Sequence, residues 1–209
     1  MSVPQRGAGR AEPVGKAQTI LAAAEQAFLA GGFGAVTMDA IAREAGVSKA
    51  TVYAHFTGKE ELFGAIVARL SERRFGGFSV EALDPIDIEA SLSAIARRYL
   101  DLVLSPEAIS LNRIIVGEVT RFPVLGQVFW AAAPERQRVQ IEAFLRRAAE
   151  AGSLAIPDAR LAAEQFAALA RGEIHLRSLL RLEDRGDPAA LDDAAASAVA
   201  TFLRAFRPG

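Results

Sequence analysis

Residues 46–63 read GVSKATVYAHFTGKEELF, and this stretch indicates which kind of domain begins the chain. A short helical pattern ends at Gly46, and a second short pattern begins just after Ser48. Two short helices joined by a brief turn that contains glycine are typical of a helix-turn-helix. The outward residues of the second helix should therefore reveal what the unit contacts.

Helical spacing divides this second helix into an inner and an outer face. Val52 and Phe56 lie one turn apart and would fill a small core together with Ile41 of the preceding helix. The other positions point largely outward, namely Lys49, Ala50, Thr51, Tyr53, Ala54 and His55. Small residues among them would let the helix backbone approach the floor of a groove closely.

The outward residues have the chemistry of a DNA-contacting surface. Lys49 can reach guanine acceptors, and the methyl group of Thr51 suits a thymine methyl. Tyr53 and His55 can donate to phosphate oxygens, which position a protein without reading sequence. Lys59, at the start of the next helix, adds charge beside free backbone N–H groups, a favourable phosphate site. An ordinary surface helix could also expose such residues, with Tyr53 packed on the first helix, so spacing alone leaves both interpretations open.

Composition excludes several classes of function. The 209 residues are 51% hydrophobic and include no cysteine, which excludes disulfides, thiolate metal sites and cysteine nucleophiles. The net charge is −1, and residues 1–75 hold 9 Lys/Arg against 7 Asp/Glu. Nucleic-acid contacts must therefore come from individually placed groups rather than from bulk charge. No apolar run suits a signal peptide or a membrane span, so we expect a soluble, cytoplasmic protein without a membrane partner.

The rest of the chain has helical periodicity and no strand-like alternation, which predicts an all-α fold. Helices are expected over residues 16–30, 38–45, 49–56, 59–75, 85–104, 106–121, 124–132, 134–151, 158–182 and 188–206. We expect a disordered arm over residues 1–13, a three-helix DNA-binding domain over 14–60, and a larger helical effector-binding and dimerisation domain over 61–209.

Three groups of residues carry a family resemblance. They are TMDAIA at 37–42, AGVS at 45–48, and TVYAHF at 51–56 followed by Lys59-Glu60. With this spacing, roughly residues 16–63 resemble the DNA-binding domain of TetR-family transcriptional regulators. The resemblance implies that Thr37, Tyr53, His55 and Lys59 hold phosphates while Lys49, Ala50 and Thr51 face bases, with Ser48 at the helix cap beside them. Ala54 departs from the larger side chain of many members, so it would contribute little to base reading.

The later half resembles the ligand domain of the AefR-like group of that family. The resemblance lies in residues 113–118, 121–123, 163–166 and 171–175. It implies a homodimeric repressor whose effector domain binds a small molecule, without fixing which molecule.

Polar and aromatic side chains of the predicted bundle over residues 85–182 are candidates for the effector pocket. They are Asn112, Arg113, Glu118, Gln127, Phe129, Trp130, Phe144, Phe166 and His175. Apolar stripes on the last two helices are candidates for a two-fold interface, namely Phe166, Ile174, Leu191, Ala195, Ala198, Val199 and Phe202. A monomeric core would accept these stripes equally well. A dimer would hold two recognition helices about one DNA turn (~34 Å) apart, as a palindromic operator requires.

The remaining motifs do not indicate an enzyme. His175 has Arg171 one turn away, but the chain holds only 2 histidines and no Gly-x-Ser-x-Gly elbow. We expect no cofactor, no metal and no catalytic residue. The sequence therefore predicts a DNA-binding transcriptional regulator, released from its operator by a small, largely apolar effector. The alternatives are an activator, or an all-α carrier of an apolar molecule with an incidental helix-turn-helix.

Overall fold

The protein is helical throughout the part that the structure describes. The computed structural model describes residues 15–76, 78–182 and 188–209, and no strand occurs within these ranges. The helices are α1 (Lys16–Ala35), α2 (Met38–Glu44), α3 (Lys49–His55), α4 (Lys59–Ser71), α5 (Ile88–Val103), α6 (Pro106–Glu118), α7 (Val124–Ala132), α8 (Pro134–Glu150), α9 (Ala159–Leu179) and α10 (Pro188–Phe206). The predicted all-α fold is confirmed. No helix of the described residues is long and apolar enough to cross a membrane.

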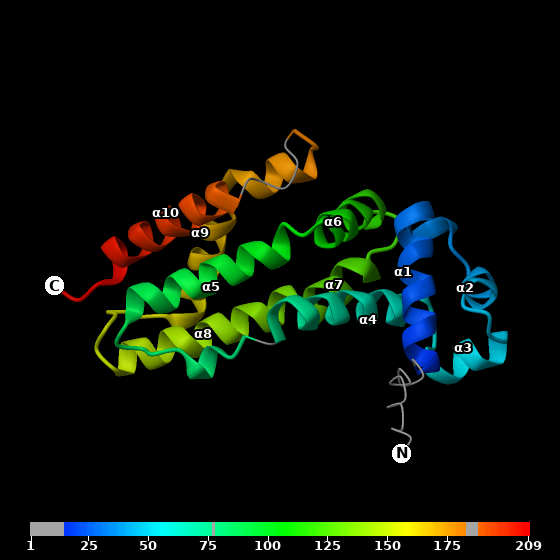
Figure 1. Cartoon of the computed structure of the whole chain (residues 1–209), viewed down its shortest axis with the longest axis horizontal. Coiled ribbons are helices and arrows are strands. Elements are labelled where there is room, and N and C mark those ends of the chain that lie inside the picture. The colour runs from blue at the N-terminus through cyan, green and yellow to red at the C-terminus, as the bar shows by residue number, and fades with distance from the viewer. Residues whose placement is uncertain (1–14, 77, 183–187) are drawn as a thin grey trace, which may run out of the picture.

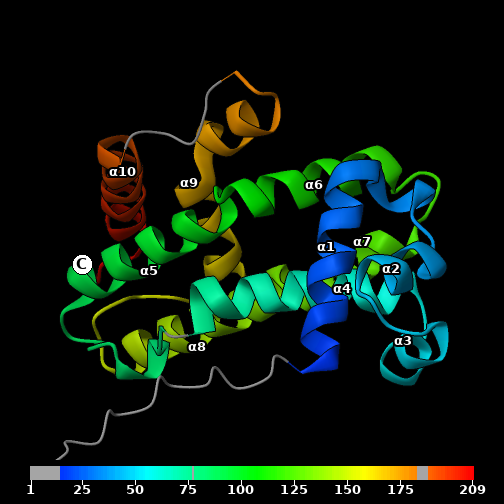
Figure 2. The same ribbon diagram turned by 45° about the vertical axis from the view of Figure 1, so that its right-hand side comes forward.

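The molecule is elongated, with α1, α2 and α3 at one end, and we call these three helices the head (Figure 1). The helices α5 to α10 form the body, and the C-terminus lies at the end opposite to α2 and α3. α4 joins the two parts, because it packs on α1 in the head and along α7 in the body. Figure 2 shows α1 crossing α4 at this junction.

The head is built around buried side chains from all three of its helices. Ile41, Val52 and Phe56, which the sequence assigns to the head core, are each 8% exposed or less. The ring of Phe28 in α1 packs edge-on against Phe63 of α4, with 5.8 Å between centroids. Each fully buried phenylalanine contributes roughly 1.5–3 kcal/mol. The start of α4 is therefore part of the head core.

α1 continues past the glycines at which the sequence predicted its end. The helix reaches Ala35, with a break at Gly32, where φ is +75°. Glycine adopts this left-handed conformation without the penalty that a Cβ would impose. The helix resumes beyond it because Phe33 is fully buried, stacked on Phe28 and packed against Phe63. The glycine pair is a kink rather than a stop.

Several other predicted helices are shorter or less regular than expected. α4 ends at Ser71 and is followed by a π-helical turn, Glu72–Gly76. α9 ends at Leu179 and is kinked at Gly172, where φ is +47°. The first helix of the body begins at Ile88, after the Asp87 cap, rather than at residue 85. The turn predicted at residues 184–187 and the arm at 1–13 lie outside the described residues.

The stripe predicted to form a dimer interface lies inside the single chain. Six of its members are 5% exposed or less, namely Phe166, Leu191, Ala195, Ala198, Val199 and Phe202. Phe202 packs on Phe166 with 5.1 Å between ring centroids, and α10 lies along α5 and α9. Ile174 is partly buried against the same core. The apolar period therefore marks the core of the body, where these side chains are covered by their own chain.

Candidate functional site

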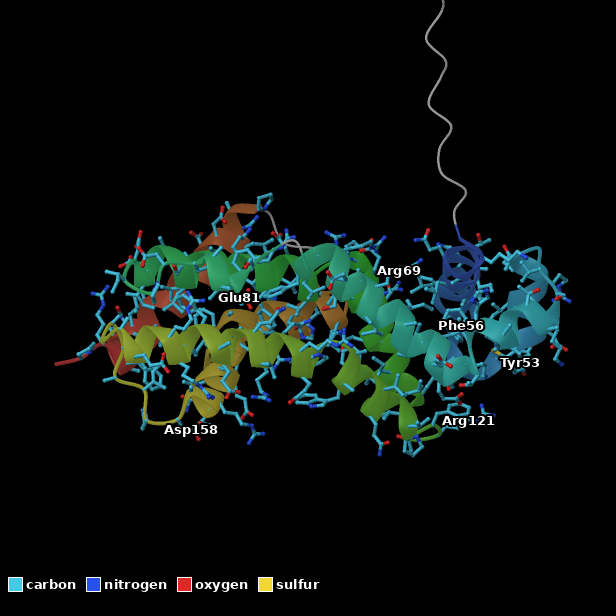
Figure 3. All side chains as sticks on the ribbon, turned by 90° about the horizontal axis from the view of Figure 1, so that it is seen from below. Tyr53, Phe56, Arg69, Glu81, Arg121 and Asp158 are labelled. Carbon is cyan, nitrogen blue, oxygen red and sulfur yellow. The ribbon has the colours of Figure 1, made fainter. Side chains whose placement is uncertain are left out.

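α3 exposes the outward residues that the sequence predicts. Lys49, Ala50 and His55 are exposed, whereas Val52 beside them is fully buried. Tyr53 is 46% exposed, so its ring is not packed into the core behind the helix. Figure 3 places Tyr53 at the head end of the molecule. The helix thus offers a solvent-facing polar strip at one end of an elongated protein.

Side-chain caps fix both short helices of the head. The Thr37 hydroxyl accepts a hydrogen bond from the Ala40 N–H at 3.1 Å, and the Ser48 hydroxyl accepts one from the Thr51 N–H at 3.1 Å. Each cap contributes about 1 kcal/mol to its helix. The Ser48 and Thr51 hydroxyls share a further hydrogen bond of 2.8 Å. This bond holds the partly buried Thr51 side chain against the cap of α3.

Lys49 is held by a carboxylate on the neighbouring helix. Its Nζ lies 2.8 Å from Oδ1 of Asp39 in α2 and 6.0 Å from the ring centroid of Tyr53. The hydrogen bond and the charge of Asp39 raise the pKa of Lys49 above its ordinary value. Both side chains are more than half exposed, so a phosphate or a base can compete for the ammonium group.

Lys59 is turned toward the head–body junction instead of standing free at the start of α4. Its Nζ donates to the Phe33 carbonyl oxygen at 2.8 Å. The same ammonium lies 4.6 Å from the centroid of the Phe33 ring and 5.8 Å from that of Phe122. Cation–π contacts of this kind contribute about 0.5–2 kcal/mol. Lys59 therefore ties α4 to the kinked end of α1, and only its remaining N–H groups can reach a phosphate.

Glu118, predicted for the effector pocket, lies instead at this junction. Its Oε1 accepts a hydrogen bond from the Gly34 N–H at 3.0 Å, and the adjacent Phe122 ring packs edge-on against Phe33 at 5.2 Å. A Cβ at Gly34 would approach Glu118, Phe122 and Arg121 to 3.1–3.3 Å. Arg121 lies toward the head end of the molecule in Figure 3. The end of α6 thus closes on the end of α1 without space for a side chain between them.

The body contains a cavity of about 330 Å³. Its wall is largely apolar, with side chains from α4 to α9, among them Val67, Leu102, Leu111 and Ile141. A volume at the lower end of the range for small-molecule sites, with a wall of apolar side chains and some polar groups, suits a small, mostly apolar ligand. The cavity lies where α4, the helix that joins the head to the body, meets the core of the body.

The structure brings some of the predicted pocket residues together and separates others. The cavity is lined by Asn112, Phe129, Trp130 and His175. Arg113 lies elsewhere, donating to the carbonyl oxygens of Leu179 and Ser178 at the end of α9. The remaining candidates outside the cavity wall are Glu118, Gln127, Phe144 and Phe166. Phe144 and Phe166 are fully buried core residues.

The sequence interpretation missed several polar residues of the wall. They are Ser71, Tyr99, Gln137, Arg138, Glu164 and Arg171. Gln137 Nε2 donates to the Ser71 hydroxyl at 3.4 Å, which links α8 to the end of α4. The one available signal was the helical spacing of Arg171 and His175. Nothing in the local sequence around Tyr99 distinguishes it from an ordinary core tyrosine.

Two of these groups have shifted pKa values. Burial and, to a smaller extent, the positive charge of Arg171 together lower the pKa of His175 to about 4. Burial raises the pKa of Tyr99, against a smaller opposing effect of Arg171. At neutral pH the cavity wall therefore presents a neutral imidazole, a neutral phenol and a guanidinium cation.

Comparison with known proteins identifies the family. Residues 20–66 match the bacterial regulatory proteins of the tetR family, and residues 90–208 match the AefR-like transcriptional repressor C-terminal domain. The chain belongs to the TetR family of transcriptional regulators. This TetR-family regulator is a DNA-binding protein with a ligand-binding domain and not an enzyme. Among its described residues, no three His, Cys, Asp or Glu side chains group as a metal site.

Similar proteins extend the match over the full length. The flavonoid-responsive regulator FrrA is 36% identical with a TM-score of 0.75, and the match covers 92% of this chain and 97% of FrrA. A TetR-family regulator from Mesorhizobium loti is 28% identical with a TM-score of 0.78. That match also covers 92% of this chain and 97% of the Mesorhizobium loti protein. The regulator SrpR of Pseudomonas putida is 32% identical over 139 residues, which are 66% of this chain and 63% of SrpR. The chain thus matches slightly less than two thirds of SrpR.

Proposed function

We propose that this regulator is a homodimeric repressor that binds a palindromic operator and is released by a small, largely apolar effector. The observation that carries the proposal is that α4 both packs in the head core and lines the cavity of the body. The AefR-like match supports repression. The flavonoid response of FrrA supports an effector with an aromatic ring system. Because its partner is DNA, we expect the protein to act in the cytoplasm.

α4 provides the physical connection between effector and operator. Phe63 near its start is buried in the head core, whereas Val67, Leu70 and Ser71 near its end line the cavity. A ligand that displaces the end of α4 would therefore tilt the head. An effector needs only a differential affinity for two head positions, and such coupling is typically 1–3 kcal/mol, about 5–150-fold in DNA affinity.

The junction between α6 and α1 supplies a second connection. Glu118 and Phe122 contact Gly34 and Phe33, while α6 also contributes Leu111 and Asn112 to the cavity wall. A movement of α6 on ligand binding would reach the end of α1 directly. The head is thus held at two points, through α4 and through α6.

The proposed dimer uses the outer face of α9. Leu161, Leu169 and Leu176 are 40–54% exposed there, and Leu180, just after the helix ends, is 60% exposed. Exposed small residues, among them Ala196 and Ala200, lie on the neighbouring α10. Clustered exposed apolar side chains are typical of interaction surfaces. A self-complementary α9–α10 face would bury these leucines and hold two heads at the spacing of an operator.

The experiment that tests this function is selection of bound sequences from random duplex DNA with wild type and Tyr53→Ala. We expect wild type to enrich a palindrome and Tyr53→Ala to enrich none, because the variant loses an exposed phosphate donor. Thermal unfolding of both proteins serves as the control and should agree closely, since Tyr53 is outside the core. If wild type enriches no sequence at low salt, the DNA-binding proposal fails and the carrier alternative becomes the better explanation.

A further inference from the structure

One part of the cavity wall carries polar groups without partners. Within the described ranges, Tyr99, Arg171 and His175 form no hydrogen bond or ion pair with another residue. Tyr99 is only 6% exposed, so its hydroxyl can find a partner chiefly inside the cavity. Buried hydroxyls are normally hydrogen-bonded, and those that are not call for a ligand or a water. With the exposed Arg171 and the partly buried His175 on the same wall, Tyr99 supplies hydrogen-bond donors that a ligand in the cavity can use.

These three side chains line the same cavity. The positive charge of Arg171 lowers the pKa of both Tyr99 and His175, so its guanidinium is within electrostatic reach of both groups. The imidazole is neutral, so it offers one N–H donor and does not add charge. Together the groups supply guanidinium, phenol and imidazole donors around a single region.

The other charges of the wall are already neutralised. Arg138 donates to Glu135 at 2.6 Å and to Glu142 at 2.5 Å. Glu164 lies 3.2 Å from Arg160 on its own helix. Arg171 is thus the cation of the described cavity wall that has no carboxylate partner. A bound organic cation would meet an uncompensated positive charge, whereas an anion would neutralise it.

We propose that the cavity selects an amphipathic organic anion, with its carboxylate, sulfonate or phenolate oxygen held by Arg171, Tyr99 and His175. The apolar body of the ligand, for which an aromatic ring system is suitable, occupies the region lined by Leu102, Leu111 and Ile141. This inference rests on the proposed function, because it takes the cavity as the effector site. It narrows the effector from an apolar molecule to one with an anionic end.

The test uses two fluorescent probes with the same ring system. 1-Anilinonaphthalene-8-sulfonate carries an anionic group, and N-phenyl-1-naphthylamine lacks it. Fluorescence titration of the full chain should give tighter binding of the sulfonate to wild type. Arg171→Gln should weaken binding of the sulfonate about tenfold, since it removes a charge-assisted contact, and should change binding of the neutral probe less than about twofold. Arg171→Lys should restore part of the preference.

Arg136→Gln is the matched control, because it removes the same charge from an exposed position on α8 that does not line the cavity. We expect it to leave both affinities unchanged. Tyr99→Phe should weaken binding of the sulfonate alone by about threefold. This variant removes the hydroxyl but keeps the ring, so it measures the contribution of the hydroxyl to binding without leaving a cavity in the core. The proposal is overturned if both probes bind wild type equally or not at all. It is also overturned if Arg171→Gln weakens both probes alike, or if Arg136→Gln has the same effect as Arg171→Gln.

Measuring operator binding distinguishes a failure of this inference from a failure of the proposed function. Without ligand, Arg171→Gln should bind the selected operator as wild type does, because Arg171 lies far from α3 in the body. Equal binding of the two probes to wild type, together with intact operator binding, would overturn only the anion proposal. If the selection from random DNA enriches no operator for wild type, the proposed function itself is overturned, whatever the two probes show.

Discussion

The head and the body present their polar side chains in opposite ways. In the head, Lys49 and Tyr53 stand in solvent on one short helix. In the body, Tyr99 and His175 come from helices distant in the sequence and meet at a cavity wall. The head surface therefore depends on local caps and one small core, whereas the cavity depends on how α4 to α9 pack together. Substitutions of exposed head residues should therefore affect DNA binding alone. Substitutions inside the body should affect both ligand binding and the free energy of unfolding.

The largest expected effect is the difference between substituting a buried residue and substituting an exposed residue on α9 and α10. Phe202 is fully buried, so Phe202→Glu should lower the free energy of unfolding by more than about 4 kcal/mol. Leu176 is 54% exposed, and Leu176→Glu should leave folding intact but give monomers and lower operator affinity about 100-fold. Light scattering, denaturant unfolding and operator titration would check both variants.

Val139→Glu is the control for this pair, since Val139 is also an exposed apolar residue, at 49%, but on α8. It should stay dimeric. A dimeric Leu176→Glu protein, or a folded and monomeric Phe202→Glu protein, would contradict the assignment of the two faces.

The pH dependence of stability should reveal the buried imidazole of the body. The pKa of His175 is about 4 when folded and about 6.5 when unfolded, so the unfolded chain binds the proton first as the pH falls. Stability should therefore decrease between about pH 6.5 and pH 4 and show no further loss from this group below that. The imidazole is only partly buried, so we expect about 1–2 kcal/mol after allowance for solvent screening.

The check on this prediction is the difference in unfolding free energy between wild type and His175→Gln across that pH range. Carboxylates that titrate nearby are common to both proteins and cancel in the difference. A constant difference would mean that the imidazole does not titrate as its environment predicts.

The junction should connect the two regions functionally. Glu118→Ala removes the acceptor of the Gly34 N–H bond and should cost about 1 kcal/mol of stability. The ratio of operator affinities without and with effector should fall about threefold, because one of the two connections to the head is lost. Glu89→Ala breaks an exposed ion pair with Arg207 in the body and should change neither quantity. An unchanged effector response in Glu118→Ala would leave α4 as the sole connection.

The smallest expected effect concerns charge on the head. Asp39→Asn releases Lys49 and removes a negative charge from the surface that faces DNA. We expect about twofold to threefold tighter operator binding, and a salt dependence steeper by up to about one counterion. Anisotropy titrations at several salt concentrations would measure both. Weaker binding would instead mean that Asp39 orients Lys49 toward a base.

The same contrast explains what could be predicted from the sequence. The caps at Thr37 and Ser48, and the buried Val52 between exposed neighbours, follow from spacing within a few residues. The kink at Gly32 could not be predicted, because the helix continues where Phe33 is buried against Phe28 and against Phe63 and Phe122, two residues distant in the sequence. A glycine pair in the sequence indicates the end of a helix, and it carries no information about packing partners that are distant in the sequence.

The cavity was harder to predict for a related reason. An apolar stripe does not indicate whether it faces its own core or a second subunit, and the stripe of Leu191 and Phe202 faces the core. Arg171 was visible beside His175, yet Tyr99, which lines the same cavity, comes from α5 and is distant in the sequence. Residues that meet only through packing leave no pattern at helical spacing.

The single tryptophan gives the molecule an optical reporter. Trp130 lines the cavity, is 55% exposed, and donates through Nε1 to Glu135 at 3.2 Å. All tryptophan emission therefore originates at the cavity wall, and none comes from the DNA-binding helices. A ligand that enters the cavity should change the intensity or the colour of that emission, while DNA bound at the head should alter it only through a movement of the body. Fluorescence of the unlabelled protein can thus follow, in a single experiment, both ligand binding in the cavity and the effect of operator binding on the cavity.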